Sequence, residues 1–116
     1  MAKAADPIVK DIQERAEGTV VVLVGEIDYN HSHKLLESLN TVIERRPARL
    51  VIDLAAVEHM DSSGLGTLVR IFQQVNGYKG KMALAAMNNR VRNAFEITRL
   101  DQFFAIRPTV EEALQV

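Results

Sequence analysis

The sequence predicts an α/β domain whose β-sheet is mostly parallel. Residues 50–54, Leu-Val-Ile-Asp-Leu, form a short apolar run of the kind that parallel sheets bury on both faces. After Gly64 the apolar residues recur at three- and four-residue steps, which is typical of one face of a helix. Strand and helix patterns alternate along the chain in the order ββαβαβαβα. This alternation favours parallel strands covered by about four helices.

The composition is that of one soluble domain. The chain has 116 residues, of which 47% are hydrophobic and 25% charged. Its net charge of −1 gives no electrostatic reason to expect nucleic acid or an anionic membrane as a partner. The absence of cysteine excludes disulfides and thiolate zinc sites. We expect a flexible tail over residues 1–7 and one domain over residues 8–116. Because no secretory or membrane-spanning segment is evident, we expect a cytoplasmic location.

The first half of the chain predicts a hairpin followed by a helix. Residues 8–15 alternate weakly as a first strand, and Glu17-Gly18 makes a turn. Residues 19–24, Thr-Val-Val-Val-Leu-Val, are the strongest β-branched run. The short connection between the two strands predicts an antiparallel pair. The next helix ends before Pro47, and its apolar stripe consists of Leu35, Leu36, Leu39, Val42 and Ile43.

The middle of the chain predicts a strand, a helix and another strand. The strand at residues 50–54 leads through a short connection at His59 and Met60 into the helix that begins near residue 62. Asn76-Gly77 closes that helix. The apolar run at residues 82–86 predicts the following strand.

Two helices and one short strand are predicted in the C-terminal part. Asn88 or Asn89 is expected to cap the first helix. Residues 103–106 predict the last strand. Thr109 and Glu112 have the spacing of a capping box and open a terminal helix. The apolar stripe of the helix after Asn89 consists of Val91, Ala94, Phe95 and Ile97.

Residues 61–66, Asp-Ser-Ser-Gly-Leu-Gly, stand between the buried strand and the helix that follows it. A helix start needs acceptors for its unpaired N–H groups, and Asp and Ser provide them. One acceptor is enough for a cap, yet three adjacent residues offer one. Gly64 and Gly66 remove side-chain bulk, so another surface can approach. The segment is therefore either a dense N-cap or an exposed serine platform for a partner, and its density favours the platform.

The same segment fits catalysis poorly. It lacks the glycine that precedes the serine in the Gly-x-Ser-x-Gly elbow of hydrolases, and the Gly-Lys-Ser or Gly-Lys-Thr ending of a nucleotide loop. Composition leaves open a triad of Ser62 with His59 and an acid, although the chain is short for a substrate cleft as well. His31 and His33 would need another donor to hold a metal, so we interpret them as exposed polar residues.

Residues 57–66, Val-Glu-His-Met-Asp-Ser-Ser-Gly-Leu-Gly, resemble the signature of the STAS family, specifically its bacterial anti-sigma factor antagonists. Gly-Glu-Ile-Asp at residues 25–28 resembles the family's Gly-Glu-Leu-Asp after the second strand, and residues 88–104 resemble its third helix and last strand. Together these matches span nearly the whole domain, and the Asp-Ser-Ser-Gly-Leu-Gly run is highly specific. Two features depart from the family pattern: Arg99 stands where relatives usually carry glycine, and Tyr29-Asn30-His31 is an unusual helix start.

The resemblance implies a single STAS domain that acts by partner switching and is not an enzyme. In the family, the unphosphorylated antagonist binds an anti-sigma factor that is also a serine kinase, and this binding frees the sigma factor. The kinase phosphorylates the first serine of the motif, here Ser62, and the complex separates. A metal-dependent serine phosphatase resets the cycle. The resemblance implies no cofactor and no metal site in this chain.

Roles for individual residues follow from that resemblance. Asp61 is expected to orient the Ser62 hydroxyl and the helix start, and Ser63 to serve as a second hydroxyl and a cap. Asp28 follows a neighbouring strand, so a parallel pairing places it at the same sheet edge as Ser62. The expected partner-binding residues are Asp28, Asp61, Ser62, Ser63, Gly64, Leu65 and Gly66.

Three other functions stay open from the sequence. The first is a scaffold or regulatory STAS domain in a stress-signalling or transporter-associated complex, without sigma-factor cycling. The second is a small nucleotide-binding module, because a helix N-terminus can hold a phosphate. The third is a hydrolase that uses Ser62. The sequence specifies neither the kinase and sigma factor nor the oligomeric state.

Overall fold

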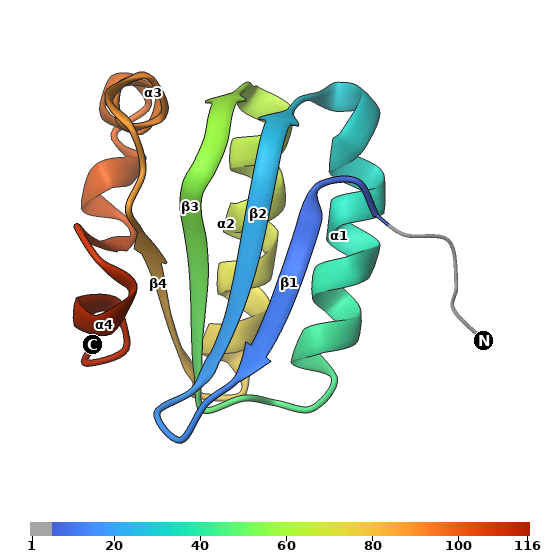
Figure 1. Cartoon of the computed structure of the whole chain (residues 1–116), viewed down its shortest axis with the longest axis vertical. Coiled ribbons are helices and arrows are strands. Elements are labelled where there is room, and N and C mark those ends of the chain that lie inside the picture. Colours follow the sequence, from blue (N-terminus) through green and yellow to red (C-terminus); the bar gives the residue numbers. More distant parts are fainter. Residues whose placement is uncertain (1–5) are drawn as a thin grey trace.

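The computed structural model describes residues 6–116 and contains one five-stranded sheet with the strand order β1-β2-β3-β4-β5 (Figure 1). The predicted element order ββαβαβαβα is confirmed, with one additional 3₁₀ turn at Leu100–Gln102. The strands are β1 (Val9–Glu14), β2 (Thr19–Ile27), β3 (Arg49–Met60), β4 (Lys81–Ala85) and β5 (Ala105–Arg107). The helices are α1 (Tyr29–Ile43), α2 (Ser62–Gly77), α3 (Asn89–Ile97) and α4 (Val110–Ala113).

The sheet is mixed in the way the sequence predicts. β1 pairs with β2 in the antiparallel sense, as the short connection at Glu17-Gly18 requires. The pairs β2–β3, β3–β4 and β4–β5 are all parallel. The C-terminal ends of β2 and β3 therefore lie at one edge of the sheet, and the chain enters α1 and α2 from that edge (Figure 1).

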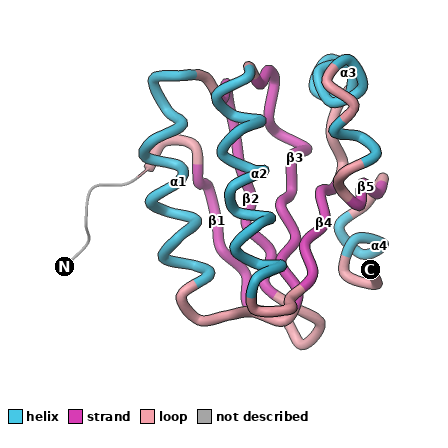
Figure 2. Tube along the Cα trace, turned by 180° about the vertical axis from the view of Figure 1, so that it is seen from behind, coloured by secondary structure: helices cyan, strands magenta, loops and turns pink. Residues whose placement is uncertain are grey.

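Two helices cover one face of the sheet. α1 and α2 lie side by side on it, as the view from behind shows (Figure 2). Their apolar stripes pack on buried strand residues such as Val21, Ile52 and Leu84. The opposite face carries Val20 and Val51, which pack with Ala113 and Leu114 in and after α4. The core is thus continuous beneath the two helices that begin at the shared edge.

β3 is longer than the predicted strand at residues 50–54. It runs to Met60, because Ala56, Val57, His59 and Met60 pair with the end of β2, and the second of two register shifts leaves Glu58 unpaired. Val57 and Met60 are buried, whereas Glu58 and His59 are exposed. The expected connection at His59 and Met60 is therefore part of the strand, and only Asp61 separates β3 from α2.

The C-terminal prediction was partly wrong. Phe103 and Phe104 do not begin the last strand, since their N–H groups donate to the Leu100 carbonyl oxygen at 3.0 and 3.1 Å. Phe104 is buried and packs edge-to-face on Phe95 and on Phe72. Ile97, assigned to the buried stripe of α3, is 73% exposed. Asn88 and Thr109 cap their helices as predicted.

The tail expected over residues 1–7 falls mostly outside the described residues. Of its described part, Asp6 is tied to the domain. Its carboxylate accepts the N–H of Ile8 at 2.9 Å and the hydroxyl of Ser38 in α1 at 2.8 Å. Within residues 6–116, none of the helices has both the length and the apolar character needed to cross a membrane.

Candidate functional site

Two acidic residues mark the edge where β2 and β3 end. Ile27 and Met60 are paired across the two strands, and Asp28 and Asp61 follow them directly. The N–H of Asp61 also donates to the Ile27 carbonyl oxygen at 3.1 Å. The prediction that Asp28 lies at the same edge as the Ser62 segment is therefore confirmed in its geometry.

Each of these aspartates is the N-cap of a helix. The Asp61 carboxylate accepts the N–H groups of Ser63 and Gly64 at 2.9 and 3.3 Å. The Asp28 carboxylate accepts the N–H of His31 at 3.2 Å and lies 2.8 Å from its Nδ1. The predicted cap role of Ser63 is wrong, because Asp61 is the N-cap of α2 and accepts the N–H groups of Ser63 and Gly64. The Asp61 carboxylate thus holds the start of α2 through these hydrogen bonds, and it makes no hydrogen bond with the Ser62 hydroxyl.

Ser62 is the first residue of α2 and is exposed at this edge. Among the described residues, its hydroxyl makes no hydrogen bond with another group of the protein. Ser63 is half-buried, and its carbonyl oxygen accepts the Thr67 hydroxyl at 3.0 Å. Of the two adjacent serines, Ser62 is the one that a second protein reaches more easily.

The two glycines of the motif have different structural causes. Gly64 is buried, and a Cβ there would lie 2.6 Å from Cγ of Met60. Gly66 is exposed, and a Cβ there would have open space within 4 Å. Leu65 is buried in the core. Gly64 and Leu65 therefore pack against the core beneath the Ser62 platform, by which we mean the accessible residues Asp61, Ser62, Ser63 and Gly66.

The surroundings of Asp28 shift the pKa of its carboxyl group. Partial burial raises the pKa of this carboxyl, but the hydrogen bond and charge of His31, with N–H groups of His31 and Asn30, outweigh it. The net effect lowers the pKa of Asp28 below its ordinary value of 3.8. Asp28 is therefore an anion at neutral pH, and it lies at the same edge of the sheet as Asp61.

A groove of about 780 Å³ opens between the first turns of α1 and α2, beside Ser63. Tyr29, at its α1 rim, is 79% exposed. Arg70 lies at the α2 side and is exposed. Arg70 was not predicted as a site residue, although it is the single charged residue between positions 62 and 77. The full lining is Tyr29, Asn30, Ser32, His33, Leu36, Ser63, Gly66, Thr67 and Arg70.

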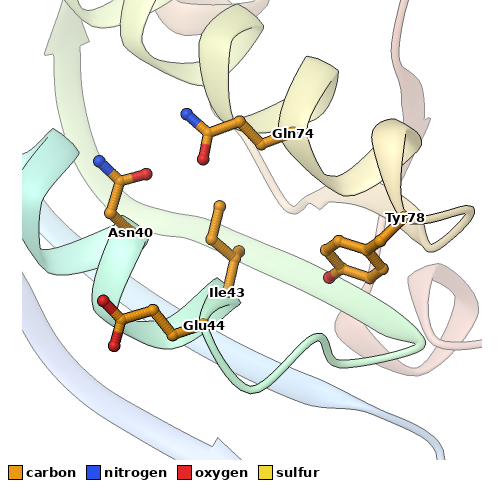
Figure 3. A pocket seen from close by; sticks show the side chains of 5 residues that line it. All are labelled: Asn40, Ile43, Glu44, Gln74 and Tyr78. Atoms are coloured by element: carbon orange, nitrogen blue, oxygen red, sulfur yellow. The ribbon is translucent and has the colours of Figure 1, made fainter.

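A second hollow, of about 450 Å³, lies at the opposite ends of the same two helices (Figure 3). Asn40 and Glu44 contribute from the α1 side and Gln74 and Tyr78 from the α2 side. Burial raises the pKa of the Tyr78 hydroxyl, which donates to the Pro47 carbonyl oxygen at 2.7 Å. This hollow is at the C-terminal end of α2, so it is not part of the Ser62 platform.

The histidines do not gather at Ser62. His59 is an exposed residue of β3 that pairs with Glu26 of β2. His31 contacts Asp28, and Nε2 of His33 lies 3.3 Å from the Glu37 carboxylate. The two α1 imidazoles thus face different carboxylates, His31 that of the N-cap Asp28 and His33 that of Glu37 in the middle of the helix. Nothing in the described geometry joins them with Ser62 as a triad.

Strand order, paired aspartate caps and an exposed serine at the second cap together define a STAS domain. The STAS domain family matches residues 8–113, so the chain belongs to this family. The chain is 33% identical over 98 residues to the anti-sigma-B factor antagonist of Listeria monocytogenes, covering 84% of this chain and 86% of the relative. It is also similar to the crystal structure of an anti-sigma factor antagonist from Mycobacterium paratuberculosis. That comparison has a TM-score of 0.85 and 31% identity, covering 98% of this chain and 97% of the other.

The fold is also that of the Bacillus protein SpoIIAA, which has been solved in two states. The TM-score is 0.76 for its unphosphorylated form, covering 90% of this chain and 91% of SpoIIAA. It is 0.69 for its phosphorylated form, covering 90% and 96%. Both share 21% identity with this chain, which supports likeness of fold alone.

Proposed function

We propose that this chain is an anti-sigma factor antagonist that works by partner switching. It binds an anti-sigma factor with serine kinase activity while the Ser62 hydroxyl is free, and it is released when Ser62 is phosphorylated. The observation that carries the proposal is the exposed Ser62 hydroxyl at the N-terminus of α2, beside two aspartate caps. The names of the relatives, which are anti-sigma factor antagonists, support it.

The start of α2 is suited to accept a phosphate without unfolding. The Asp61 carboxylate accepts hydrogen bonds from the N–H groups of Ser63 and Gly64, and the backbone carbonyl oxygen of Asp61 accepts one from the N–H of Leu65. The N–H of Ser62 is left without an acceptor in this turn, and it lies next to the position that a phosphate on Ser62 would occupy. A helix N-terminus favours anions through its free N–H groups and its dipole. Phosphorylation therefore leaves the domain folded.

The same phosphate disfavours a docked partner. It adds a charge of about −1.5 to −2. That charge would be placed beside Asp61 and near Asp28, both at the shared edge. Removing such an anion from water without a compensating cation costs several kcal/mol. A shift from mostly bound to mostly free needs about 5.5 kcal/mol for a hundredfold excess each way, and a desolvated dianion supplies energy of that order.

The exposure of the motif residues indicates which of them contact the kinase. Asp28, Asp61, Ser62, Ser63 and Gly66 are exposed or half-buried at the edge, and they form the contact with the kinase. Gly64 and Leu65 are buried and keep these residues in place. A metal-dependent serine phosphatase removes the phosphate and returns the protein to its binding state.

Incubation with ATP and purified anti-sigma factor kinases of the source organism, followed by mass spectrometry, tests the proposal. One of these kinases is expected to add a single phosphate to the wild type. Ser62→Ala abolishes it, whereas the matched variant Ser63→Ala retains it. Phosphate on Ser62→Ala at the wild-type level would place the acceptor elsewhere and contradict the proposal.

A further inference from the structure

The surface of α2 is unusual for a solvated helix. At the chain's average of 25% charged residues, a helix of this length would carry about four, yet α2 carries one, Arg70. Its other exposed positions are serine, glycine, glutamine and asparagine. Depletion of charge is typical of the central part of a protein interface, where water is excluded. The exposed side of α2 thus has the composition of a docking surface.

The groove beside Ser63 adds two anchors to that surface. Tyr29 is a large side chain that its own domain leaves 79% exposed. Arg70 stands across the groove and has no carboxylate within salt-bridge distance among the described residues. Tyrosine and arginine are among the residue types that most often dominate binding energy at interfaces. Leu36 and Gly66 line the space between them with apolar or small groups.

The groove is continuous with the Ser62 platform, since Ser63 and Gly66 belong to both. A partner seated over Ser62 therefore covers the groove as well. We propose that this groove is the specificity surface for the kinase, an inference that rests on the proposed function. Tyr29 fills an apolar pocket of the kinase, and Arg70 pairs with one of its carboxylates. Because Tyr29 and Arg70 both line the groove beside Ser63, these two residues decide which kinase binds.

The test measures dissociation constants of unmodified protein with the kinase that phosphorylates Ser62. Tyr29→Ala and Arg70→Glu are each expected to weaken binding by at least about tenfold, as hot-spot residues do. Both side chains are exposed, so both variants keep the wild-type circular dichroism spectrum. Ile97→Ala truncates another exposed apolar side chain, and Lys79→Glu reverses a charge at the far end of α2. These two matched controls bind like the wild type.

A charge-swap experiment identifies the partner of Arg70. Acidic surface residues of the kinase are replaced one at a time by lysine, and one such variant is expected to restore binding of Arg70→Glu. Wild-type affinity for both Tyr29→Ala and Arg70→Glu, with Ser62 still phosphorylated, would overturn the inference and leave the proposed function intact. If no kinase phosphorylates wild-type Ser62, the proposed function itself fails. If Tyr29→Ala abolishes self-association in sedimentation but leaves kinase binding unchanged, the groove joins two copies of this chain and the inference is overturned.

Discussion

A Cβ atom on Gly64 would lie 2.8 Å from Cγ2 of Ile27 and 3.0 Å from its carbonyl oxygen. Ile27 is the last residue of β2 and is fully buried. The absence of a side chain at position 64 therefore lets the first turn of α2 rest directly on the end of a neighbouring strand. This contact fixes the height of Ser62 above the sheet, because only one residue separates Ser62 from Gly64.

Gly64→Ala is expected to destabilise the domain by about 1–3 kcal/mol, since the new methyl group overpacks a closed contact. Gly66→Ala is the matched control, because a Cβ there meets nothing within 4 Å. It stabilises the helix by about 0.5–1 kcal/mol relative to glycine. Urea unfolding followed by circular dichroism measures both changes. Equal stability of the two variants would contradict this account of the motif.

Asp61→Ala is expected to lower the free energy of unfolding by about 1–2 kcal/mol, because two N–H groups at the start of α2 lose their acceptor. Asp61→Asn keeps an acceptor oxygen in the same place and is expected to recover most of that loss. The comparison uses the same urea unfolding at neutral pH. A loss as large in the asparagine variant would show that charge, and not capping, is what stabilises this helix start.

The acidity of Asp28 predicts a dependence of stability on pH. Because its folded-state pKa lies below the ordinary value of 3.8, the ionised carboxyl stabilises the folded state above that value. The contribution is lost as the pH falls through the folded-state pKa. Asp28→Asn retains a capping side chain but cannot ionise, so its stability is expected to converge toward that of the wild type below about pH 4. Unfolding curves from pH 3 to pH 7 measure the difference. A constant difference over this range would argue against the Asp28–His31 interaction.

Arg99 adopts the left-handed conformation, with φ of 63°. A side chain in this region is strained, whereas glycine adopts it freely. Glycine would therefore adopt the backbone conformation of this position without that strain. Arg99→Gly is expected to raise the free energy of unfolding by about 0.5–1 kcal/mol, a gain limited by the greater freedom of glycine in the unfolded chain. Thermal unfolding measures the gain, and a lower melting temperature would mean that the arginine side chain makes a stabilising contact.

The sequence predicted the edge that carries the site because that edge depends on strand order alone. Once two parallel strands are adjacent, residues that follow them, such as Asp28 and Asp61, meet at one edge. The family signature then singled out Ser62. Capping at Asn88 and Thr109 was predictable too, since a cap depends on residues close in the sequence.

Other features depend on contacts between distant segments, and the sequence did not predict them. His59 and Met60 were expected in a connection, yet pairing with Glu26 and Ile27 of β2 keeps them in β3. Phe104 leaves the expected strand because it packs on Phe72 and Phe95. The groove beside Ser63 exists only where α1 and α2 pack together, so Arg70 was not assigned to it.

The effect of Ser62 phosphorylation on the affinity for the kinase is the decisive measurement for partner switching. The unmodified protein and the protein phosphorylated at Ser62 are titrated with the same kinase, without ATP and at one salt concentration. Phosphorylation is expected to weaken binding about ten-thousandfold, equivalent to about 5.5 kcal/mol, while the circular dichroism spectrum stays unchanged. Equal dissociation constants for the two forms would contradict it.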